Sequence, residues 1–124
     1  MQHDMLSDAL SAIKNAENVG KRSCSVLRSK LVIAVLKVLK ENNYIEDFKE
    51  KERIIEITLR GKINELAAIK PRFPVKTDGF VKFESRYLPS RSIGIILVST
   101  PQGVISHVQA KKKNVGGRLI AYVF

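Results

Sequence analysis

The chain has 124 residues, of which 44% are hydrophobic and 27% charged, a balance that supports folding by burial and excludes a disordered protein. A single cysteine, Cys24, excludes an internal disulfide and a cysteine-rich zinc site. No apolar stretch approaches the roughly 18–20 residues that cross a bilayer, so we expect a soluble intracellular protein without a membrane partner. The formal net charge of +10 favours a polyanionic partner.

The first part of the chain predicts two helices with a short strand between them. The first helix is indicated by apolar residues at helical spacing, which are Leu6, Ala9, Leu10, Ile13 and Ala16. Asp4 is its candidate cap and Gly20 its stop. Residues 23–28 mix polar and apolar positions as a short strand does. Ser29 then caps a second helix that ends at Asn42 and Asn43.

Two strands follow, at residues 44–49 and 53–59. The charged residues 50–52 between them are a short turn, so a hairpin is expected. Residues 62–68 match no pattern, and Pro71 and Pro74 fix an extended edge segment over residues 69–75.

The last part predicts a short helix over residues 77–86, weakened by Gly79, and a loop at Pro89, Ser90 and Ser92. Residues 93–99 are apolar on both faces and predict a central strand, with residues 104–105 as its partner. Ser106 caps a small helix through Lys113, and residues 118–124 close the sheet.

The predicted fold class is therefore α+β, with two small lobes. Residues 1–75 form an N-terminal α/β lobe of helices beside a small sheet. Residues 76–124 form a C-terminal β-rich lobe, a three-stranded antiparallel sheet with a short helix, and the segment 76–92 is the expected boundary between the lobes.

Charge is distributed unevenly between the halves. Residues 1–69 contain 12 basic and 10 acidic side chains, a net charge of +2, whereas residues 70–124 contain 10 and 2, a net charge of +8. The C-terminal half is thus the better candidate for contact with an anion.

An apolar run in that half ends at two hydroxyl side chains, Ser99 and Thr100, and a turn follows in which Gly103 leaves the backbone bare. Cations come next at residues 111–113, and then a double glycine. Hydroxyls, bare backbone and cations suit RNA, which offers phosphates and hydrogen-bonding edges. Two plainer interpretations stay open: the hydroxyls bond their own turn, and the lysines only solvate a helix end.

No catalytic or metal constellation accompanies this turn. A nucleophilic reading pairs Ser99 or Thr100 with His107, but only Asp78 or Glu84 in this lobe is available to orient the histidine, and no nucleophile elbow surrounds the serine. His3 and His107 have no spaced partner ligands. We therefore expect no enzyme, no metal, no cofactor and no small-molecule substrate. The few aromatic side chains fit core packing better than base stacking.

The segment from Leu97 to His107, LVSTPQGVISH, resembles the signature of the universal small-subunit ribosomal protein number eight family, V-S-T-[ST]-x-G-[VI]-M-[ST]-[HD]. That family continues with an alanine-containing helix and G-G-x-[LI], which Ala110, Gly116, Gly117 and Leu119 match. The similarity covers essentially the whole chain. The K-P-R-F-P block at residues 70–74 and Arg118 after the double glycine resemble the archaeal branch.

The resemblance implies a structural constituent of the small ribosomal subunit that is cytoplasmic and ribosome-bound. It implies a primary rRNA-binding protein, held on a bulged helix of the central domain, which it helps to assemble beside neighbouring small-subunit ribosomal proteins. An mRNA that mimics this site, including the protein's own, is a further RNA partner that the family suggests. From the residues alone, the alternatives are a free regulatory RNA binder and a small RNA-modifying or cleaving enzyme, and the absence of a catalytic constellation argues against the enzyme.

Carried over residue by residue, the resemblance implies that Ser99, Thr100 and Gly103 contact bases and backbone, and that Lys30 contacts RNA from the N-terminal lobe. We assign recognition to the two hydroxyls and affinity to the cations, because a hydroxyl both donates and accepts hydrogen bonds. Pro101 and Gln102 depart from the family pattern, which often has a third hydroxyl and a lysine there. The candidate RNA-contacting residues are Ser99, Thr100, Gln102, Gly103, Lys30, Lys111, Lys112, Lys113, Gly116, Gly117 and Arg118.

Overall fold

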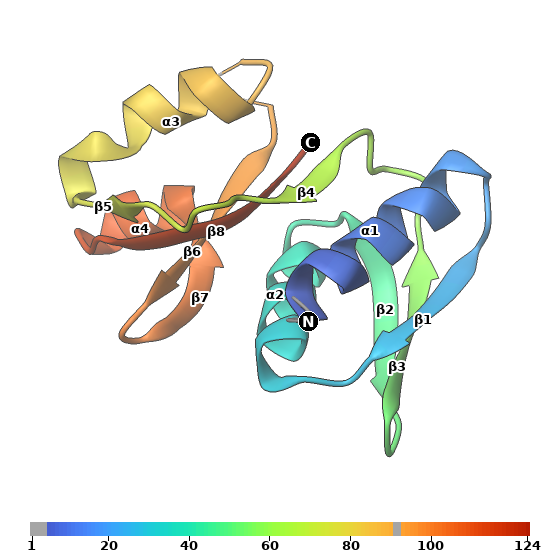
Figure 1. Ribbon diagram of the computed structural model, residues 1–124. Coiled ribbons are helices and arrows are strands. Elements are labelled where there is room, and N and C mark those ends of the chain that lie inside the picture. Colours follow the sequence, from blue (N-terminus) through green and yellow to red (C-terminus); the bar gives the residue numbers. More distant parts are fainter. Residues whose placement is uncertain (1–4, 91–92) are drawn as a thin grey trace. The chain divides into compact units, whose positions relative to one another are not determined.

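The computed structural model describes residues 5–90 and 93–124 and divides into two compact units, Met1–Ala67 and Ala68–Phe124 (Figure 1). We refer to them as unit 1 and unit 2. Both combine helices with antiparallel strands, which confirms the predicted α+β class. None of the described helices is long and apolar enough to cross a bilayer.

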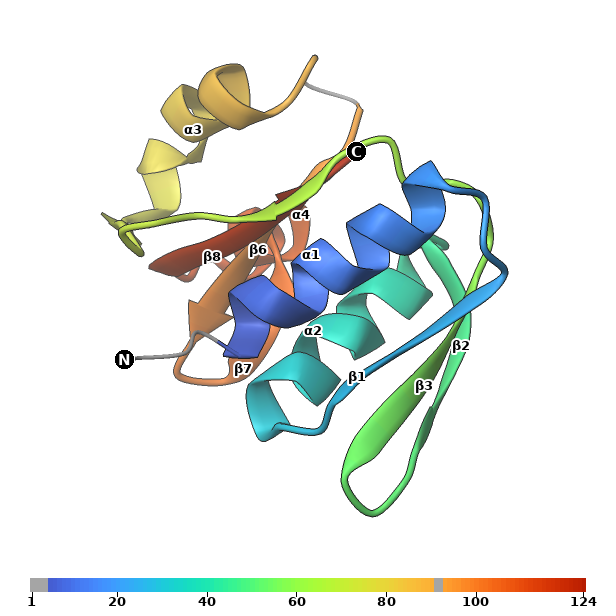
Figure 2. The same ribbon diagram turned by 45° about the vertical axis from the view of Figure 1, so that its right-hand side comes forward.

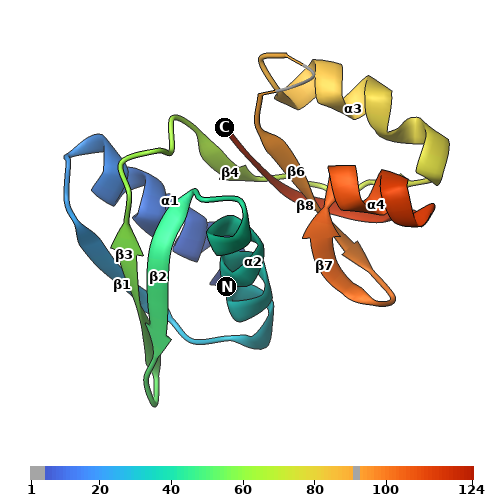
Figure 3. The ribbon, with the colours of Figure 1, turned by 180° about the vertical axis from the view of Figure 1, so that it is seen from behind.

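Unit 1 packs two helices on one face of a three-stranded sheet (Figures 1 and 3). Its elements are α1 (Met5–Asn18), β1 (Ser23–Leu27), α2 (Lys30–Glu41), β2 (Ile45–Glu50) and β3 (Ile54–Leu59). The strand order is β1-β3-β2, with antiparallel pairs. Along β3, Ile55 and Ile57 are buried while Glu56 and Thr58 are exposed, so the helices cover one face and the other meets solvent.

The helices of unit 1 form where their sequences predict them. The buried residues of α1 are the predicted apolar set, namely Leu6, Ala9, Leu10, Ile13 and Ala16. Ser29 is the N-cap of α2, and its hydroxyl oxygen accepts a hydrogen bond from the Val32 N–H at 3.1 Å. The expected cap of α1, Asp4, lies outside the described residues.

Unit 2 builds its core between a sheet and two helices (Figure 2). Its helical elements are the 3-10 turn η1 (Thr77–Gly79), α3 (Phe80–Tyr87) and α4 (His107–Lys113). Its strands are β5 (Pro74–Val75), β6 (Ile95–Thr100), β7 (Gly103–Ser106) and β8 (Gly117–Val123), with β4 (Leu66–Ala68) at the division point. Phe80 and Ala110 from the helices pack in one cluster with Ile96, Val98 and Leu119 from the sheet.

Among the described residues, the strands of unit 2 belong to a sheet of five strands, where the sequence predicted three. Its order is β4-β8-β6-β7, and β5 also pairs with β8. The two additional strands are β4, in residues 62–68 that matched no pattern, and β5, in the predicted edge segment 69–75. The backbone of β8 pairs with this segment: the Ile69 N–H donates to the Ile120 carbonyl and the Leu119 N–H to the Phe73 carbonyl, both at 2.9 Å. Strands of two or three residues are too short to leave a periodic pattern.

The division between the two units follows Ala67, and β5, which pairs with β8, lies within unit 2. The central strand begins at Ile95 rather than at residue 93, since Gly94 takes a positive φ of 89° and a Cβ there would lie 2.6 Å from the Val123 carbonyl oxygen. Ser92 of the predicted loop lies outside the described residues.

Candidate nucleic-acid interface

The β6–β7 hairpin carries the hydroxyl turn, which projects as a loop from unit 2 (Figures 1 and 3). Thr100 pairs with Gly103, so Pro101 and Gln102 are the exposed tip. Gly103 has a φ of 121°, and beyond its two chain neighbours no described residue has an atom within 4 Å of where its Cβ would be. Glycine is therefore required there by backbone conformation, and the space beside it is open to a ligand.

The Thr100 hydroxyl holds this turn together. It donates to the Gly103 carbonyl oxygen at 2.8 Å and accepts from the Gln102 N–H at 3.2 Å, and the residue is 9% exposed. Its single proton and one of its two lone pairs are thus used. The plainer interpretation, in which a strand-end hydroxyl bonds its own turn, describes what Thr100 does within the protein.

Ser99 is placed differently. Its side chain is half-buried and makes no hydrogen bond to any other described residue. Ser99 is aligned across the sheet with Val104 on β7 and with Arg118 on β8. Aligned residues of antiparallel strands share a face with their Cβ atoms about 5 Å apart. A free hydroxyl and a guanidinium are therefore side by side next to the turn.

Arg118 is exposed and anchored at one end. Its Nη1 donates to the Arg72 carbonyl oxygen at 3.3 Å, which leaves the other guanidinium donors available. Arginine presents its donors in a planar fork that fits phosphate, so this position suits a backbone contact to RNA.

Gly116 and Gly117 have a packing role. A Cβ on Gly116 would lie 2.5 Å from the Val75 carbonyl oxygen, and one on Gly117 would overlap the Ser99 carbonyl oxygen. The double glycine thus lets β5 and β6 approach β8 closely. Contact with RNA stays a prediction for both residues.

The three lysines of α4 are not equivalent. Lys111 donates to the carboxylate of Glu84 on α3, a residue that is 4% exposed. Lys112 and Lys113 are exposed in the last turn, and Asn114 in left-handed conformation ends the helix. Among the described acids, none forms an ion pair with Lys112 or Lys113. These two lysines are the ones free to meet phosphate.

His107 is a structural residue of the same cluster. It is 1% exposed, its Nδ1 accepts the Ile96 N–H at 2.9 Å, and its Nε2 lies 3.4 Å from Glu84 Oε1. Because Nδ1 is an acceptor, Nε2 carries the proton and faces the carboxylate. Burial lowers the pKa of His107, against the attraction of Glu84. Both ring nitrogens are engaged with partners other than Ser99 and Thr100, so no nucleophile–base pair forms.

Lys30 belongs to unit 1, at the first residue of α2. It lines an open hollow of about 410 Å³ with Arg28, Ser29 and Arg53, and Glu52 is the acid on its wall. Arg53 was missed from sequence. The pairing of Leu27 with Ile54 brings it beside the start of α2, and the Arg28 N–H donates to its carbonyl oxygen at 3.0 Å. Only the register of β1 on β3 reveals this neighbour.

No group of three or more metal-ligating side chains occurs among residues 5–90 and 93–124. Four of the five acids of the β2–β3 hairpin, all except Glu52, pair instead with lysines or arginines, as Asp47 does with Lys40 at 2.9 Å and Glu56 with Lys51 at 2.6 Å. A solvated, ion-paired hairpin accounts for these acids.

Comparisons with known proteins agree with the features of the site. A family model described as Ribosomal protein S8 matches residues 4–124. A curated relative named Small ribosomal subunit protein uS8, from Methanococcoides burtonii, is 44% identical over 126 aligned positions that cover 98% of this chain and 97% of the relative. The resemblance stated from sequence is confirmed, and with it the absence of an enzymatic role and a place on the ribosome in the cytoplasm. The chain therefore belongs to the ribosomal protein S8 family, a family of structural constituents of the small ribosomal subunit.

Proposed function

We propose that the chain is a primary binder of small-subunit rRNA that attaches to a bulged helix of the central domain and helps that domain to assemble. Unit 2 carries the main contact, and Lys30 in unit 1 adds a second. The observation that carries the proposal is the free Ser99 hydroxyl aligned with Arg118 beside an open, glycine-dependent turn.

A-form RNA displays 2′-hydroxyls and base edges in a wide, shallow minor groove. A narrow hairpin tip with small side chains fits that surface, and a serine hydroxyl both donates and accepts there. The Thr100 hydroxyl has only one lone pair left for a hydrogen bond from RNA. Ser99 is therefore the main residue that recognises the RNA, and Thr100 maintains the conformation of the turn. Exposed Lys112, Lys113 and Arg118 contact phosphates and so supply affinity that does not depend on the nucleotide sequence of the RNA.

The proposal is tested by binding to a central-domain rRNA hairpin and to a shuffled hairpin across a salt series. Ser99→Ala should cost on the order of 1–2 kcal/mol of binding to the cognate hairpin alone, because an RNA group is left unpaired. Its thermal stability should not change, since the hydroxyl bonds no described residue.

Thr100→Val is the matched control. It should lower the unfolding free energy by about 1 kcal/mol, because the turn loses two hydrogen bonds, and weaken RNA binding less than Ser99→Ala does. Equal binding of both hairpins by the wild-type protein would contradict the proposal. No observation on the described residues favours the protein's own mRNA over rRNA, so binding to that mRNA is measured in the same assay.

A further inference from the structure

The sheet of unit 1 ends in two very different edge strands. β2, at one edge, contains four charged residues and a register shift between Ile45 and Asp47. β1, at the other edge, has the uncharged sequence Ser-Cys-Ser-Val-Leu and pairs with β3 in unbroken register. Charges and bulges are the usual means by which proteins keep other strands from joining an edge. β2 has both and β1 has neither.

The outer edge of β1 offers backbone hydrogen-bonding groups. Arg22 and Arg28 flank β1. The Arg28 N–H donates to the Arg53 carbonyl oxygen at 3.0 Å, and the Arg22 carbonyl oxygen accepts from the Leu59 N–H at 2.8 Å, so the backbone groups of both flanking residues point toward β3. Because the backbone N–H and C=O groups of successive residues point to opposite sides of a strand, those of Cys24 and Val26 also point toward β3. The N–H and C=O groups of Ser23, Ser25 and Leu27 therefore point away from the sheet.

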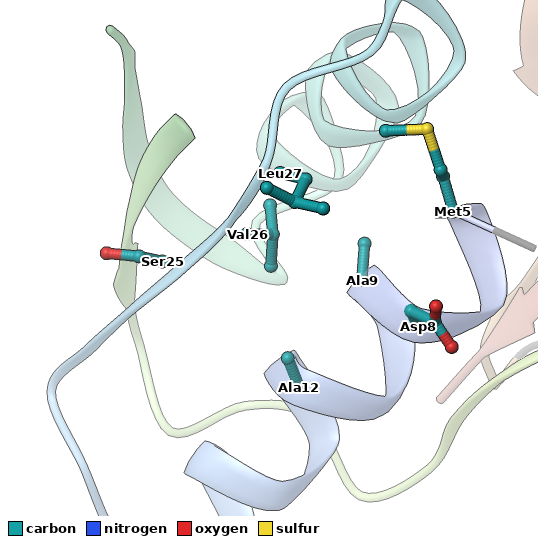
Figure 4. A pocket seen from close by; sticks show the side chains of 7 residues that line it. All are labelled: Met5, Asp8, Ala9, Ala12, Ser25, Val26 and Leu27. Carbon is teal, nitrogen blue, oxygen red and sulfur yellow. The ribbon is translucent and has the colours of Figure 1, made fainter. Parts of the chain in front are cut away.

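A groove runs along β1 beside α1. One hollow of about 560 Å³ lies between Met5, Ala9 and Ala12 on α1 and Ser25, Val26 and Leu27 on β1 (Figure 4). A second, of about 430 Å³, shares Ala12 and Ser25 with the first and continues past Cys24 to Val19. The small alanine side chains leave space between α1 and β1. Large apolar side chains are exposed at both ends of the groove: Met5 (40% exposed) and Leu27 (63%) at one end, and Val19 (70%) at the other.

The charges of the groove are few and opposite. Of the side chains that line the two hollows, the charged ones are Asp8, at the Leu27 end, and Lys21, at the Ser23 end. This balance offers no excess of cations to RNA, in contrast with unit 2. A strand added antiparallel to β1 would start beside Asp8 and finish beside Lys21. The complementary strand therefore has a basic residue at its amino end and an acidic residue at its carboxyl end.

We propose that the outer edge of β1 and its groove bind an extended segment of a protein partner as an added antiparallel strand. The segment has apolar side chains at alternate positions, facing Ala9 and Ala12, and the end charges just described. Backbone hydrogen bonds supply affinity in this mode, and the alternating side chains supply specificity. This surface goes beyond RNA binding and belongs to the other unit from the hydroxyl turn.

The geometry fixes which backbone groups of the added strand are bonded. Residues opposite Ser23 and Ser25 share their solvent-facing side and exchange hydrogen bonds with them, whereas residues opposite Cys24 and Val26 face the helices and point their N–H groups away. The polar positions of the added strand are thus the bonded ones, and the apolar positions are not.

The test uses the full chain and a synthetic peptide, Lys-Val-Ser-Val-Ser-Val-Glu with capped ends. Cys24 is the chain's only cysteine and lines the groove, so occupancy is read as slower alkylation of Cys24 by iodoacetamide, followed by mass spectrometry. The peptide should slow alkylation saturably. N-methylation at its two serines should abolish the effect, and N-methylation at its valines should preserve it. A peptide with the end charges exchanged should bind about two- to fivefold more weakly.

Ser25→Pro is the matched protein variant, because it removes an outward N–H and leaves the bonds to β3 intact. It should lose peptide binding, while binding to the rRNA hairpin is unchanged, which separates this proposal from the proposed function. Equal effects of the two N-methylated peptides, or none from the parent peptide, would overturn the proposal. So would protection of Cys24 by the rRNA hairpin, or protection that rises with protein concentration alone, which would identify a second copy as the occupant.

Discussion

The two units carry their charge in different ways. Unit 1 has more cations than unit 2, 12 against 10, yet a net charge of only +2 against +8. Five of its described lysines and arginines form ion pairs with acids of the same unit, and the hydrogen bond from Lys40 lowers the pKa of the Asp47 carboxyl. In unit 2 the acids are Glu84, which is buried, and the exposed Asp78. Net charge, rather than the number of cations, therefore distinguishes the unit for which we propose contact with a polyanion.

The largest expected effect comes from the buried acid of unit 2. Glu84→Ala should lower the unfolding free energy by about 3 kcal/mol, because His107 Nε2 and Lys111 lose their shared acceptor. Urea denaturation measures the change. Asp47→Ala removes an exposed ion pair in unit 1 and should leave the urea midpoint unchanged. Similar losses for both variants would contradict the contrast between a buried and a surface acid.

Close backbone approach in unit 2 gives the next effect. Gly117→Ala should destabilise by about 1–3 kcal/mol, because the new Cβ overlaps the Ser99 carbonyl and forces β8 away from β6. Gly79→Ala is the control, since its Cβ would meet only the tip of the Val75 side chain, at 3.1 Å. Thermal unfolding of the two variants should rank them clearly. If Gly117→Ala is as stable as the wild type, the packing role of the double glycine is wrong.

Unpaired and paired lysines should differ in the salt dependence of RNA binding. Lys112→Ala should reduce the slope of log K against log salt by about 0.7–0.9 and weaken cognate and shuffled hairpins alike. Lys51→Ala, which removes a lysine already bonded to Glu56, should leave the slope unchanged. Filter binding at several salt concentrations measures both. Equal slopes for the two variants would remove the distinction drawn between the units.

The smallest expected effect is a pH dependence from His107. Burial holds its folded pKa below the ordinary value of 6.5, and protonation would also break the bond from the Ile96 N–H. The unfolded state then binds more protons than the folded state just below that value, so stability is complete above about pH 6.5 and falls as the pH drops toward the folded pKa. Denaturation across this range should show the decline in the wild type. In His107→Gln this component should be missing, and an identical profile would refute the assignment.

The longer helices and strands were predictable because the spacing of apolar residues within each one indicates which of its faces is buried. The buried residues of α1 follow the helical spacing, and Ile55, Ile57 and Leu59 on β3 alternate with polar neighbours. Local chemistry also placed the caps, as Ser29 and Ser106 each accept a hydrogen bond from the third residue that follows. Strand β4 was not predicted, and β5 was predicted only as an extended edge segment, because both are defined by their pairing with β8 and not by a pattern in their own residues.

The candidate RNA site divides along the same line. Sequence identified the residue types of the turn, the excess of cations in unit 2 and the family, since these depend on composition and motif. Tertiary structure decided which groups are free: it bound Lys111 to Glu84 and Thr100 to its own turn, and left Ser99 beside Arg118. Hydrogen bonds between distant residues depend on strand register and helix packing. The order of residues along the chain therefore does not indicate which side chains are already hydrogen-bonded within the protein and which remain free to bind RNA.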